Sequence, residues 1–310
     1  MQKILVTAAD LAKEALALLT DYEVVFAGKT PSAADVTALC KAHNPVAIIV
    51  RYGRIDALQM DAAPALKVIS KHGSGIDTID SAAAGKRGIT VVAATAVNAD
   101  AVAEHSLALM LAAAKSVIGL NERMHAGHWD KSTHKSLELR GKTVGLVGLG
   151  AIGLRFAMLC KALGMRALGH DPFANPERCK AAGVEVVDLA TVLREADVLS
   201  LHCPLTLENK GFINTVTLTQ CKRGVIFINT ARGGLVDEAA MLTAVQSGQV
   251  GTAALDSFAV EPFPSTSPAP HPFQNQAGFI LSPHIGGVTS DAYVNMGLAA
   301  AQNVLNCLKG

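Results

Sequence analysis

Long apolar runs are absent from this 310-residue sequence, although 50% of its residues are hydrophobic and its mean hydropathy is +0.32. The longest apolar stretch, residues 102–118, is interrupted by Glu104, His105 and Lys115. No segment reaches the roughly 20 apolar residues that a membrane-spanning helix needs. The opening residues, MQKILVTAAD, lack the basic, apolar and small-residue zones of a signal peptide. We therefore expect no membrane partner and a cytoplasmic protein.

A dominant charge is also absent, because 27 Lys and Arg face 26 Asp and Glu, which gives a formal net charge of +1. No block of like charges interrupts this balance. Such a surface offers no electrostatic footprint for nucleic acid or for an anionic membrane. We expect no nucleic-acid partner, whereas a small anionic ligand needs only local positive charge.

The six cysteines form no C-x-x-C pair, and none has a histidine at metal-ligand spacing. A structural zinc site needs such a cluster, and a disulfide framework is typical of short secreted chains. The sequence therefore predicts no metal site and six free thiols. We expect Cys160 and Cys221 to lie on helices as small hydrophobic residues.

What the sequence does contain is an alternation of short apolar runs with helical segments, about every 20 to 30 residues, which is typical of βαβ units. The length fits two domains. The first series predicts strands at 3–7, 23–26, 46–50, 67–70 and 90–93, with helices near 8–19, 32–43 and 77–86. One long helix is expected from Ala101 to about Ala126.

The second series predicts strands at 143–148, 165–170, 184–187, 198–202, 225–229, 251–256 and 279–282. Their β-branched runs show little alternation, as expected for parallel strands covered by helices on both faces. The proline-rich stretch 261–272 reads as a surface loop, and residues 290–308 again have a helical pattern. The sequence predicts an α/β protein with two domains and parallel sheets.

A glycine-rich turn follows the strand expected at 143–148 and carries Gly148, Gly150 and Gly153 in G-x-G-x-x-G spacing. The first glycine permits the tight turn, the second lets the backbone approach a pyrophosphate, and the third allows close packing of helix and strand. The helix N-terminus that follows offers free N–H groups to phosphates. The alternative is a packing turn without a ligand.

Asp171 lies 18 residues after Gly153, at the end of the next expected strand. A carboxylate at this place binds the ribose hydroxyls of a dinucleotide and repels a 2′-phosphate. Pro172 and Phe173 follow it where an arginine would accommodate that phosphate. The pattern favours NAD over NADP, and the alternative is that Asp171 is only a turn residue.

Three further side chains follow expected strands: Arg232 after 225–229, Glu261 after 251–256 and His284 after 279–282. The carboxyl ends of parallel strands form the edge at which open α/β sheets bind ligands. Each residue alone has an ordinary interpretation as a surface ion pair, a solvated charge or a turn histidine. Together, beside a dinucleotide, they predict a site that moves a proton and a hydride.

Over essentially its whole length the chain resembles the D-isomer-specific 2-hydroxyacid dehydrogenases. The resemblance is carried by HGSGIDTID (72–80), VNADAVAEHSLALML (97–111), ELRGKTVGLVGLGAIG (138–153), HCPLT (202–206), NTARGGLVDE (229–238), ALDSFAVEP (254–262) and SPHIGG (282–287). It implies two Rossmann-like or flavodoxin-like α/β domains, with an NAD-binding domain (98–287) inserted into a substrate-binding domain (1–97 and 288–310). It also implies a homodimer.

The resemblance assigns roles to individual residues. Arg232 would bind the substrate carboxylate and keto oxygen, His284 would be the acid/base, and Glu261 would be its partner. Asp256 would hold the nicotinamide carboxamide. The implied cofactor-binding residues are Gly148, Gly150, Ala151, Ile152, Gly153, Asp171, His202, Cys203, Pro204, Thr230, Ala231, Arg232, Asp256, His284, Gly286 and Gly287.

Ordinary chemistry supports these roles. His284 would give a proton to the keto oxygen as a hydride from NADH reaches the carbon, and both steps reverse in oxidation. A carboxylate at Glu261 would favour the protonated imidazole and raise its pKa. Arg232 offers a carboxylate a planar fork that lysine cannot replace equally well.

Substrate choice is expected to depend on the loop at residues 72–75 and on two cations. The loop resembles the family's glycine loop, whose amides bind the substrate carboxylate, and it contains Ser74 and Gly75. Arg51 matches a position where phosphoglycerate dehydrogenases often hold arginine, and Lys71 matches a second basic position. Together they would bind a phosphate; the alternative is two solvated loop cations.

The leading expectation is therefore an NAD-dependent dehydrogenase for 3-phosphoglycerate and phosphohydroxypyruvate, without the C-terminal regulatory extension that such enzymes commonly carry. A hydroxypyruvate or glyoxylate reductase, or an enzyme for a sulfonate- or carboxylate-bearing hydroxyacid, is the alternative, since Lys71 replaces the arginine expected there. A hypothesis of another class is an NAD-sensing corepressor that binds peptides.

Overall fold

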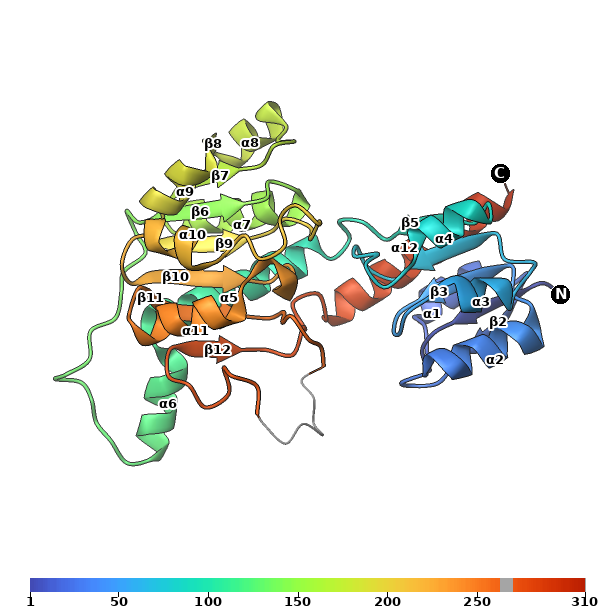
Figure 1. The fold of residues 1–310 in the computed structure, drawn as a ribbon, viewed down its shortest axis with the longest axis horizontal. Coiled ribbons are helices and arrows are strands. Elements are labelled where there is room, and N and C mark those ends of the chain that lie inside the picture. The colour runs from blue at the N-terminus through green and yellow to red at the C-terminus, as the bar shows by residue number, and fades with distance from the viewer. Residues whose placement is uncertain (263–269, 310) are drawn as a thin grey trace. The chain divides into compact units, whose positions relative to one another are not determined.

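A computed structural model describes residues 1–262 and 270–309. The chain folds into two compact units, a first unit of Met1–Asn98 with Val288–Gly310 and a second unit of Ala99–Gly287 (Figure 1). Each unit is built on a parallel sheet with helices around it. The predicted fold class is confirmed.

The first unit holds a five-stranded parallel sheet in the order β2-β1-β3-β4-β5. Its strands are β1 (Lys3–Val6), β2 (Glu23–Phe26), β3 (Ala47–Val50), β4 (Val68–Lys71) and β5 (Thr90–Ala93). Its helices are α1 (Lys13–Leu18), α2 (Ala33–His43), α3 (Ala57–Asp61), α4 (Ser81–Lys86) and α12 (Ser290–Lys309). The chain thus returns from the second unit to complete the first, because α12 packs against α1 and the sheet.

Local sequence explains why these elements start and stop where they do. Ser32 and Asp35 form a reciprocal capping box at the start of α2, which satisfies two amides that the helix cannot pair itself. Asn44 ends the same helix in the left-handed conformation that asparagine tolerates. Between the helix layers, β3 is buried along its whole length, as a central parallel strand should be.

The second unit holds a seven-stranded parallel sheet in the order β12-β11-β10-β9-β6-β7-β8. Its strands are β6 (Thr143–Val147), β7 (Arg166–His170), β8 (Val184–Val186), β9 (Val198–Leu201), β10 (Val225–Asn229), β11 (Val250–Leu255) and β12 (Phe279–Leu281). Its helices are α5 (Ala99–Lys115), α6 (Val117–His125), α7 (Ala151–Ala162), α8 (Pro176–Ala182), α9 (Leu189–Glu195), α10 (Thr215–Gln220) and α11 (Glu238–Gln246), with a 3₁₀ turn at Gly233–Leu235.

The order of this sheet reverses direction beside β6. The chain runs from β6 outward through β7 and β8, then returns to place β9 on the other side of β6. Two hydrophobic cores cover the two faces, one with α5 and α7 and the other with α9, α10 and α11. A reversal of this kind opens a crevice at the carboxyl ends of the strands, where ligands bind in doubly wound sheets.

The prediction of one helix from Ala101 to Ala126 is wrong. Ser116 has a left-handed φ of 53°, which ends α5 and begins α6, and the two helices meet at a bend of 59°. Apolar residues continue through the bend, which is why the pattern looked unbroken, but none of the residues in α6 is buried. Of the described helices, no single one is long and apolar enough to span a membrane; α5 and α6 meet that measure only as a bent pair.

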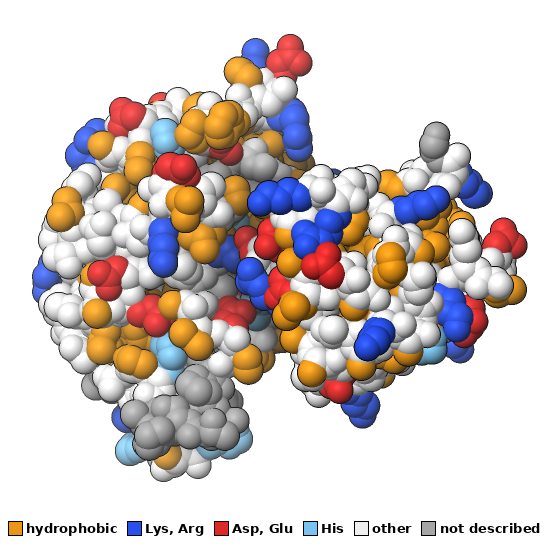
Figure 2. Space-filling model, turned by 45° about the vertical axis from the view of Figure 1, so that its right-hand side comes forward, with side chains coloured by type: hydrophobic (Ala, Val, Ile, Leu, Met, Phe, Trp, Pro, Cys, Tyr) orange, Lys and Arg blue, Asp and Glu red, His pale blue; other side chains and the backbone are white. Residues whose placement is uncertain are grey.

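Two smaller expectations also need adjustment. The helix expected near residues 8–19 begins only at Lys13, after a turn. Cys160 lies buried in α7, and Cys221 lies buried directly after α10. All six cysteines are free thiols. Charged side chains of both signs are interspersed over the face that Figure 2 displays, as a net charge of +1 leads one to expect.

Candidate active site at the strand ends

The glycine turn joins β6 to α7 in a form that only glycine permits. Gly148 has a φ of +100°, and a Cβ there would lie 2.5 Å from the carbonyl carbon of His202. A Cβ at Gly153 would lie 2.2 Å from the Gly148 carbonyl oxygen. At Gly150, by contrast, a Cβ would meet nothing within 4 Å. The turn is packed against protein at Gly148 and Gly153 and open at Gly150, so its middle fits a close-approaching phosphate.

The start of α7 completes this feature. Gly150 is the N-cap and has no side chain to accept the first amides, which belong to Ala151, Ile152 and Gly153. These N–H groups have no partner within the helix and carry the positive end of its dipole. A helix N-terminus of this kind is suited to an anion such as a pyrophosphate.

Asp171 lies at the end of β7, beside the glycine turn. Its Oδ2 accepts the Leu149 amide at 2.8 Å, and its Oδ1 accepts the Phe173 amide at 2.8 Å. A carboxylate has about four acceptor positions, so two stay available for a pair of hydroxyl groups. The side chain therefore fits the predicted ribose contact, with the 94% exposed ring of Phe173 next to it.

The segment after β9, residues 202–204, is not set up for proton transfer or nucleophilic attack. Burial lowers the pKa of His202 to about 3 and raises the pKa of the Cys203 thiol to about 11. The His202 ring packs against Phe156 at 5.3 Å and its Nε2 contacts Ser200 Oγ at 2.9 Å. A neutral histidine and an un-ionised thiol can form the wall of a binding pocket, which is all that the predicted cofactor-binding role of residues 202–204 requires.

Arg232 follows β10 on a turn that the buried Asn229 holds in place. The Asn229 side chain accepts the Ala231 amide at 3.0 Å and donates to the Arg232 carbonyl at 2.9 Å. A Cβ at Gly233 would lie 1.9 Å from the Phe258 carbonyl carbon, so the loop after β11 packs directly on this turn. Asn229 was not predicted as a site residue, although its place in NTARGG pointed to the turn.

His284 and Glu261 form the central pair of the site. His284 Nδ1 lies 2.6 Å from Glu261 Oε2, and Glu261 Oε1 accepts the Phe258 amide at 2.8 Å. The hydrogen bond with Glu261 raises the pKa of His284 against the opposing effect of burial. Burial raises the pKa of Glu261, but the bonds from His284 and Phe258 outweigh it, so the net pKa is lowered. The imidazole is therefore kept cationic to higher pH.

Arg232 lies close enough to act on both members of this pair. Its positive charge lowers the pKa of His284 and that of Glu261. The structure thus brings together the arginine, the carboxylate and the histidine that the sequence placed after three different strands. Nδ1 of His284 is taken by Glu261, which leaves Nε2 for a substrate oxygen.

Asp256 ends β11 and is 1% exposed. Its Oδ1 accepts the Ser282 hydroxyl at 2.6 Å and the Ile285 amide at 2.9 Å, and its Oδ2 accepts the Gly286 amide at 2.8 Å. Burial raises the pKa of Asp256, but these bonds and one from His105 outweigh burial, so the net pKa is lowered. The carboxylate is thus largely occupied by the segment that carries His284, with one acceptor position left on Oδ2 for the predicted carboxamide.

The cations predicted to choose the substrate lie in the first unit. Arg51 follows β3 and forms an ion pair with the Asp10 carboxylate, and its Nη1 also donates to the Asp10 carbonyl at 2.9 Å. Its guanidinium carbon lies 4.8 Å from the centre of the Tyr293 ring. The Arg51 side chain is only 13% exposed, against 70% for Asp10. Lys71, at the end of β4, donates to the Arg51 carbonyl at 3.2 Å, so both cations lie together.

The glycine loop at residues 72–75 follows β4 directly. Its Gly73 has a φ of +132°, in the region that favours glycine. The Ser74 hydroxyl donates to Asn98 Oδ1 at 3.2 Å, so it is engaged inside the first unit. Gly75 is half-buried. Burial and the nearby Arg51 lower the pKa of His72 to about 4, so His72 adds no positive charge to those of Arg51 and Lys71.

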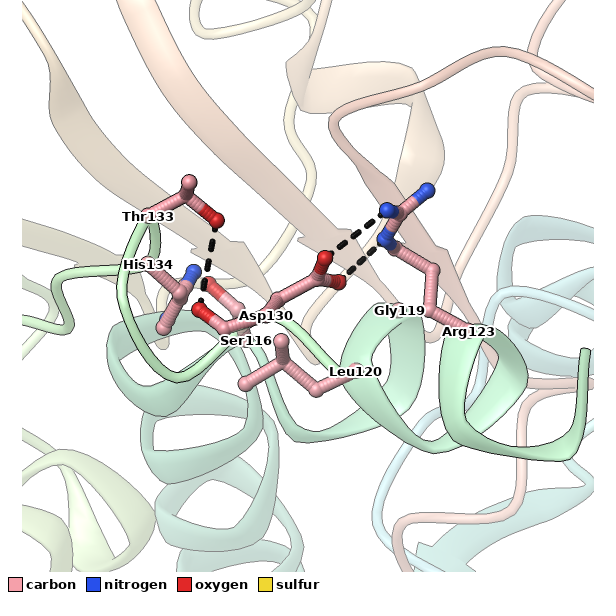
Figure 3. A pocket seen from close by; sticks show the side chains of 7 residues that line it. All are labelled: Ser116, Gly119, Leu120, Arg123, Asp130, Thr133 and His134. Atoms are coloured by element: carbon pink, nitrogen blue, oxygen red, sulfur yellow. Dashed lines mark hydrogen bonds and ion pairs between the residues drawn. The ribbon is translucent and has the colours of Figure 1, made fainter. Parts of the chain in front are cut away.

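A cavity of about 370 Å³ lies in the second unit, between α6 and the following loop (Figure 3). It is lined by Ser116, Gly119, Leu120, Arg123, Asp130, Thr133 and His134. Arg123 and Asp130 pair across it through two hydrogen bonds, one of 2.9 Å. The cavity contains none of the predicted site residues. Among residues 1–262 and 270–309, no group of acidic, histidine or cysteine side chains could hold a metal ion.

Comparison with known proteins adds independent findings. The sequence model described as "D-isomer specific 2-hydroxyacid dehydrogenase, NAD binding domain" matches residues 107–286. A D-3-phosphoglycerate dehydrogenase of Archaeoglobus fulgidus is 42% identical over 266 residues, which cover 85% of this chain and 50% of that protein. One of Bacillus subtilis is 38% identical over 79% of this chain and 46% of its own length. The chain spans about half the length of these curated relatives.

Solved structures match over nearly the full chain. The TT0316 protein of Thermus thermophilus has a TM-score of 0.89 and 35% identity, and the match covers 100% of this chain and 97% of that one. A glyoxylate reductase from Paecilomyes thermophila has a TM-score of 0.87 and 28% identity, with 99% and 95% covered. The two-unit architecture is therefore shared with these proteins.

Proposed function

The chain belongs to the D-isomer specific 2-hydroxyacid dehydrogenase family, and we propose that it transfers a hydride between NAD(H) and a small 2-hydroxy or 2-keto acid. The observation that carries the proposal is the 2.6 Å pair of His284 and Glu261 beside Arg232. This acid/base pair lies on the same sheet as the open glycine turn and Asp171. We assign NAD binding to residues 98–287 and substrate binding to residues 1–97 and 288–310.

In the proposed reduction of a keto acid, three residues of the chain have separate roles. NADH supplies the hydride. Arg232 binds the substrate carboxylate through its planar fork and polarises the keto oxygen. His284 donates a proton from Nε2 to that oxygen, while Glu261 holds Nδ1–H and stabilises the imidazolium before transfer. In the oxidative direction the neutral imidazole accepts the proton from the hydroxyl group.

For the substrate we propose 3-phosphoglycerate and phosphohydroxypyruvate, with Arg51 and Lys71 binding the phosphate and the amides of the loop around Ser74 and Gly75 binding the carboxylate. The names of the curated relatives support this choice. A phosphate would have to replace Asp10 beside Arg51. Because Asp10 is exposed and Arg51 is nearly buried, the aspartate is the partner that can leave.

The same ion pair also favours the second candidate, a hydroxypyruvate or glyoxylate reductase. If Asp10 stays on Arg51, the cation is already neutralised and the first unit offers less attraction for a second anionic group. A keto acid without a phosphate would then be preferred. The glyoxylate reductase with a TM-score of 0.87 is consistent with this choice.

NADH oxidation against phosphohydroxypyruvate, hydroxypyruvate and glyoxylate tests both candidates. We expect turnover that depends on His284 and prefers the phosphorylated substrate, with the preference lost in Arg51→Ala and Lys71→Ala. Equal turnover of hydroxypyruvate and phosphohydroxypyruvate would overturn the phosphate assignment. No turnover of any keto acid with NADH would overturn the proposed reaction.

We further propose a cytoplasmic homodimer in which a second copy covers α6. Val117, Ile118 and Met124 on this helix and Trp129 after it are exposed, the last to 74%. An apolar set of this kind is typical of an interface. The proposed cytoplasmic location rests on a separate observation, since the six free thiols fit a reducing compartment.

The dimer can be tested by fluorescence. Trp129 is the sole tryptophan of the chain, so its emission should shift to longer wavelength on dilution if the dimer buries it; an emission that never shifts, with a monomer mass, would contradict this.

A further inference from the structure

A chain of hydrogen bonds runs from α5 to the segment that carries His284. His105 Nε2, on α5, lies 3.0 Å from Ser282 Oγ, and Ser282 Oγ lies 2.6 Å from Asp256 Oδ1. His105 Nε2 is itself 3.4 Å from Asp256 Oδ1. All three residues belong to the second unit. No role in the reaction follows for His105 or Ser282 from the sequence motifs.

The direction of the protons in this chain follows from Asp256. Its carboxylate accepts the Ile285 and Gly286 amides and is ionised, so the bond with Ser282 must have the hydroxyl as donor. The Ser282 oxygen then accepts from His105, which must carry its proton on Nε2. Each member therefore fixes the orientation of the next.

The segment that this chain holds contains a backbone conformation that needs support. His284 has a φ of +55°, in the left-handed region that residues with a Cβ rarely adopt. Its own amide donates to the Ser282 carbonyl at 3.0 Å, and the next two amides are bound by Asp256. Such a conformation persists only where the surroundings impose it.

Packing shows that the support is direct. A Cβ at Gly286 would lie 2.9 Å from Asp256 Oδ2 and 3.4 Å from the Cδ2 atom of the His105 ring. The backbone after His284 is thus pressed against both the carboxylate and the histidine. A substitution of His105 would therefore alter a contact that the segment carrying His284 makes directly.

We propose that His105 is a positioning residue for His284, acting through Ser282 and Asp256. It orients the carboxylate, the carboxylate fixes the amides of Ile285 and Gly286, and these hold the His284 ring against Glu261. The inference rests on the proposed function for the effect on turnover. Its effect on the His284–Glu261 pair does not depend on which substrate is used.

The test compares His105→Ala, His105→Gln and Ser282→Ala with the exposed neighbour change Glu104→Gln, which leaves the chain of bonds intact. Glutamine can place an N–H near the position of Nε2, whereas alanine removes the donor. We expect kcat in His105→Ala to fall on the order of 10- to 100-fold, since a small misplacement of a reacting group costs this much. The KM for the keto acid should change little, and His105→Gln should recover most of kcat.

A second readout is the titration of the His284 ring, followed by NMR in the full chain. Because the bond to Glu261 raises the pKa of His284, a ring that is poorly held should titrate at lower pH in His105→Ala and in Ser282→Ala. Glu104→Gln should match the wild type in both readouts. An unchanged His284 titration and kcat in His105→Ala, or a His105→Gln variant as impaired as His105→Ala, would overturn the proposal. If the wild type reduces no keto acid, the proposed function fails while the titration still decides the positioning role.

Discussion

Two ion pairs at strand ends, His284 with Glu261 in the second unit and Arg51 with Asp10 in the first, do different work. In the His284–Glu261 pair the cation can give up its proton. Glu261 holds the imidazole ring in place and raises the pKa of His284. In the Arg51–Asp10 pair the cation is a nearly buried guanidinium, and its partner is an exposed carboxylate. We propose that the His284–Glu261 pair moves a proton and that the Arg51–Asp10 pair exchanges its aspartate for the phosphate of a substrate. Proton transfer is thus proposed for the second unit, and recognition of a substrate phosphate is proposed for the first.

The largest expected effect comes from removing the proton donor. His284→Ala should lower kcat about 10²- to 10⁴-fold, the range found for general acid–base groups, because the variant lacks the imidazole that gives the proton. Steady-state assays with NADH and hydroxypyruvate give the rate, and NADH fluorescence gives cofactor affinity. Retained turnover, or a loss fully explained by lost cofactor binding, would contradict the acid/base role.

The next effect tests the fork of Arg232. Arg232→Lys keeps the charge but loses the paired N–H donors, so kcat/KM for a keto acid should fall about 10- to 100-fold. Lys222→Arg, a reverse exchange at an exposed residue that pairs with Asp197, is a suitable control. A lysine variant as active as the wild type would mean that Arg232 contributes only charge.

Glu261→Gln should change the pH dependence more than the rate. The bond to Glu261 raises the pKa of His284 above its ordinary value, so reduction is supported at low pH and declines as pH rises through that raised pKa. Without the carboxylate the decline should begin at lower pH, with a loss of kcat of about tenfold or more. An unshifted profile of kcat against pH would show that the pair does not control the titration.

The smallest effect concerns the other pair. Asp10→Asn should improve kcat/KM for phosphohydroxypyruvate about two- to fivefold, because an exposed carboxylate no longer competes for Arg51. Glyoxylate, which has no second anionic group, should be unaffected. Asp61→Asn, which breaks the exposed pair with Arg87, is the matched control. A gain for both substrates or for neither would remove Asp10 from substrate choice.

The features that the sequence predicted are those that depend on local order along the chain. Gly148, Gly150 and Gly153 are close neighbours, and the βαβ alternation places Arg232, Glu261 and His284 after three strands whose carboxyl ends share an edge. Parallel topology alone therefore predicts that they meet. The segment 263–269 of the expected loop lies outside the described residues.

The features that escaped prediction depend on contacts between distant residues or on one backbone angle. His105 and Ser282 are separated by 177 positions, and nothing in the pattern of α5 distinguishes a histidine that reaches a carboxylate from one in a solvated position. Asp10 and Arg51 likewise meet only through the sheet. The bend at Ser116 depends on a single positive φ, which hydrophobic periodicity does not reveal.

The most direct test of the account is the rate of NADH oxidation by the wild-type chain with hydroxypyruvate across the pH range. With His284 as the proton donor and its pKa raised by Glu261, the rate should be high at low pH and fall as a single step above about pH 6.5, the ordinary value for histidine. No NADH oxidation, or a rate that increases with pH through that region, would contradict the central claim.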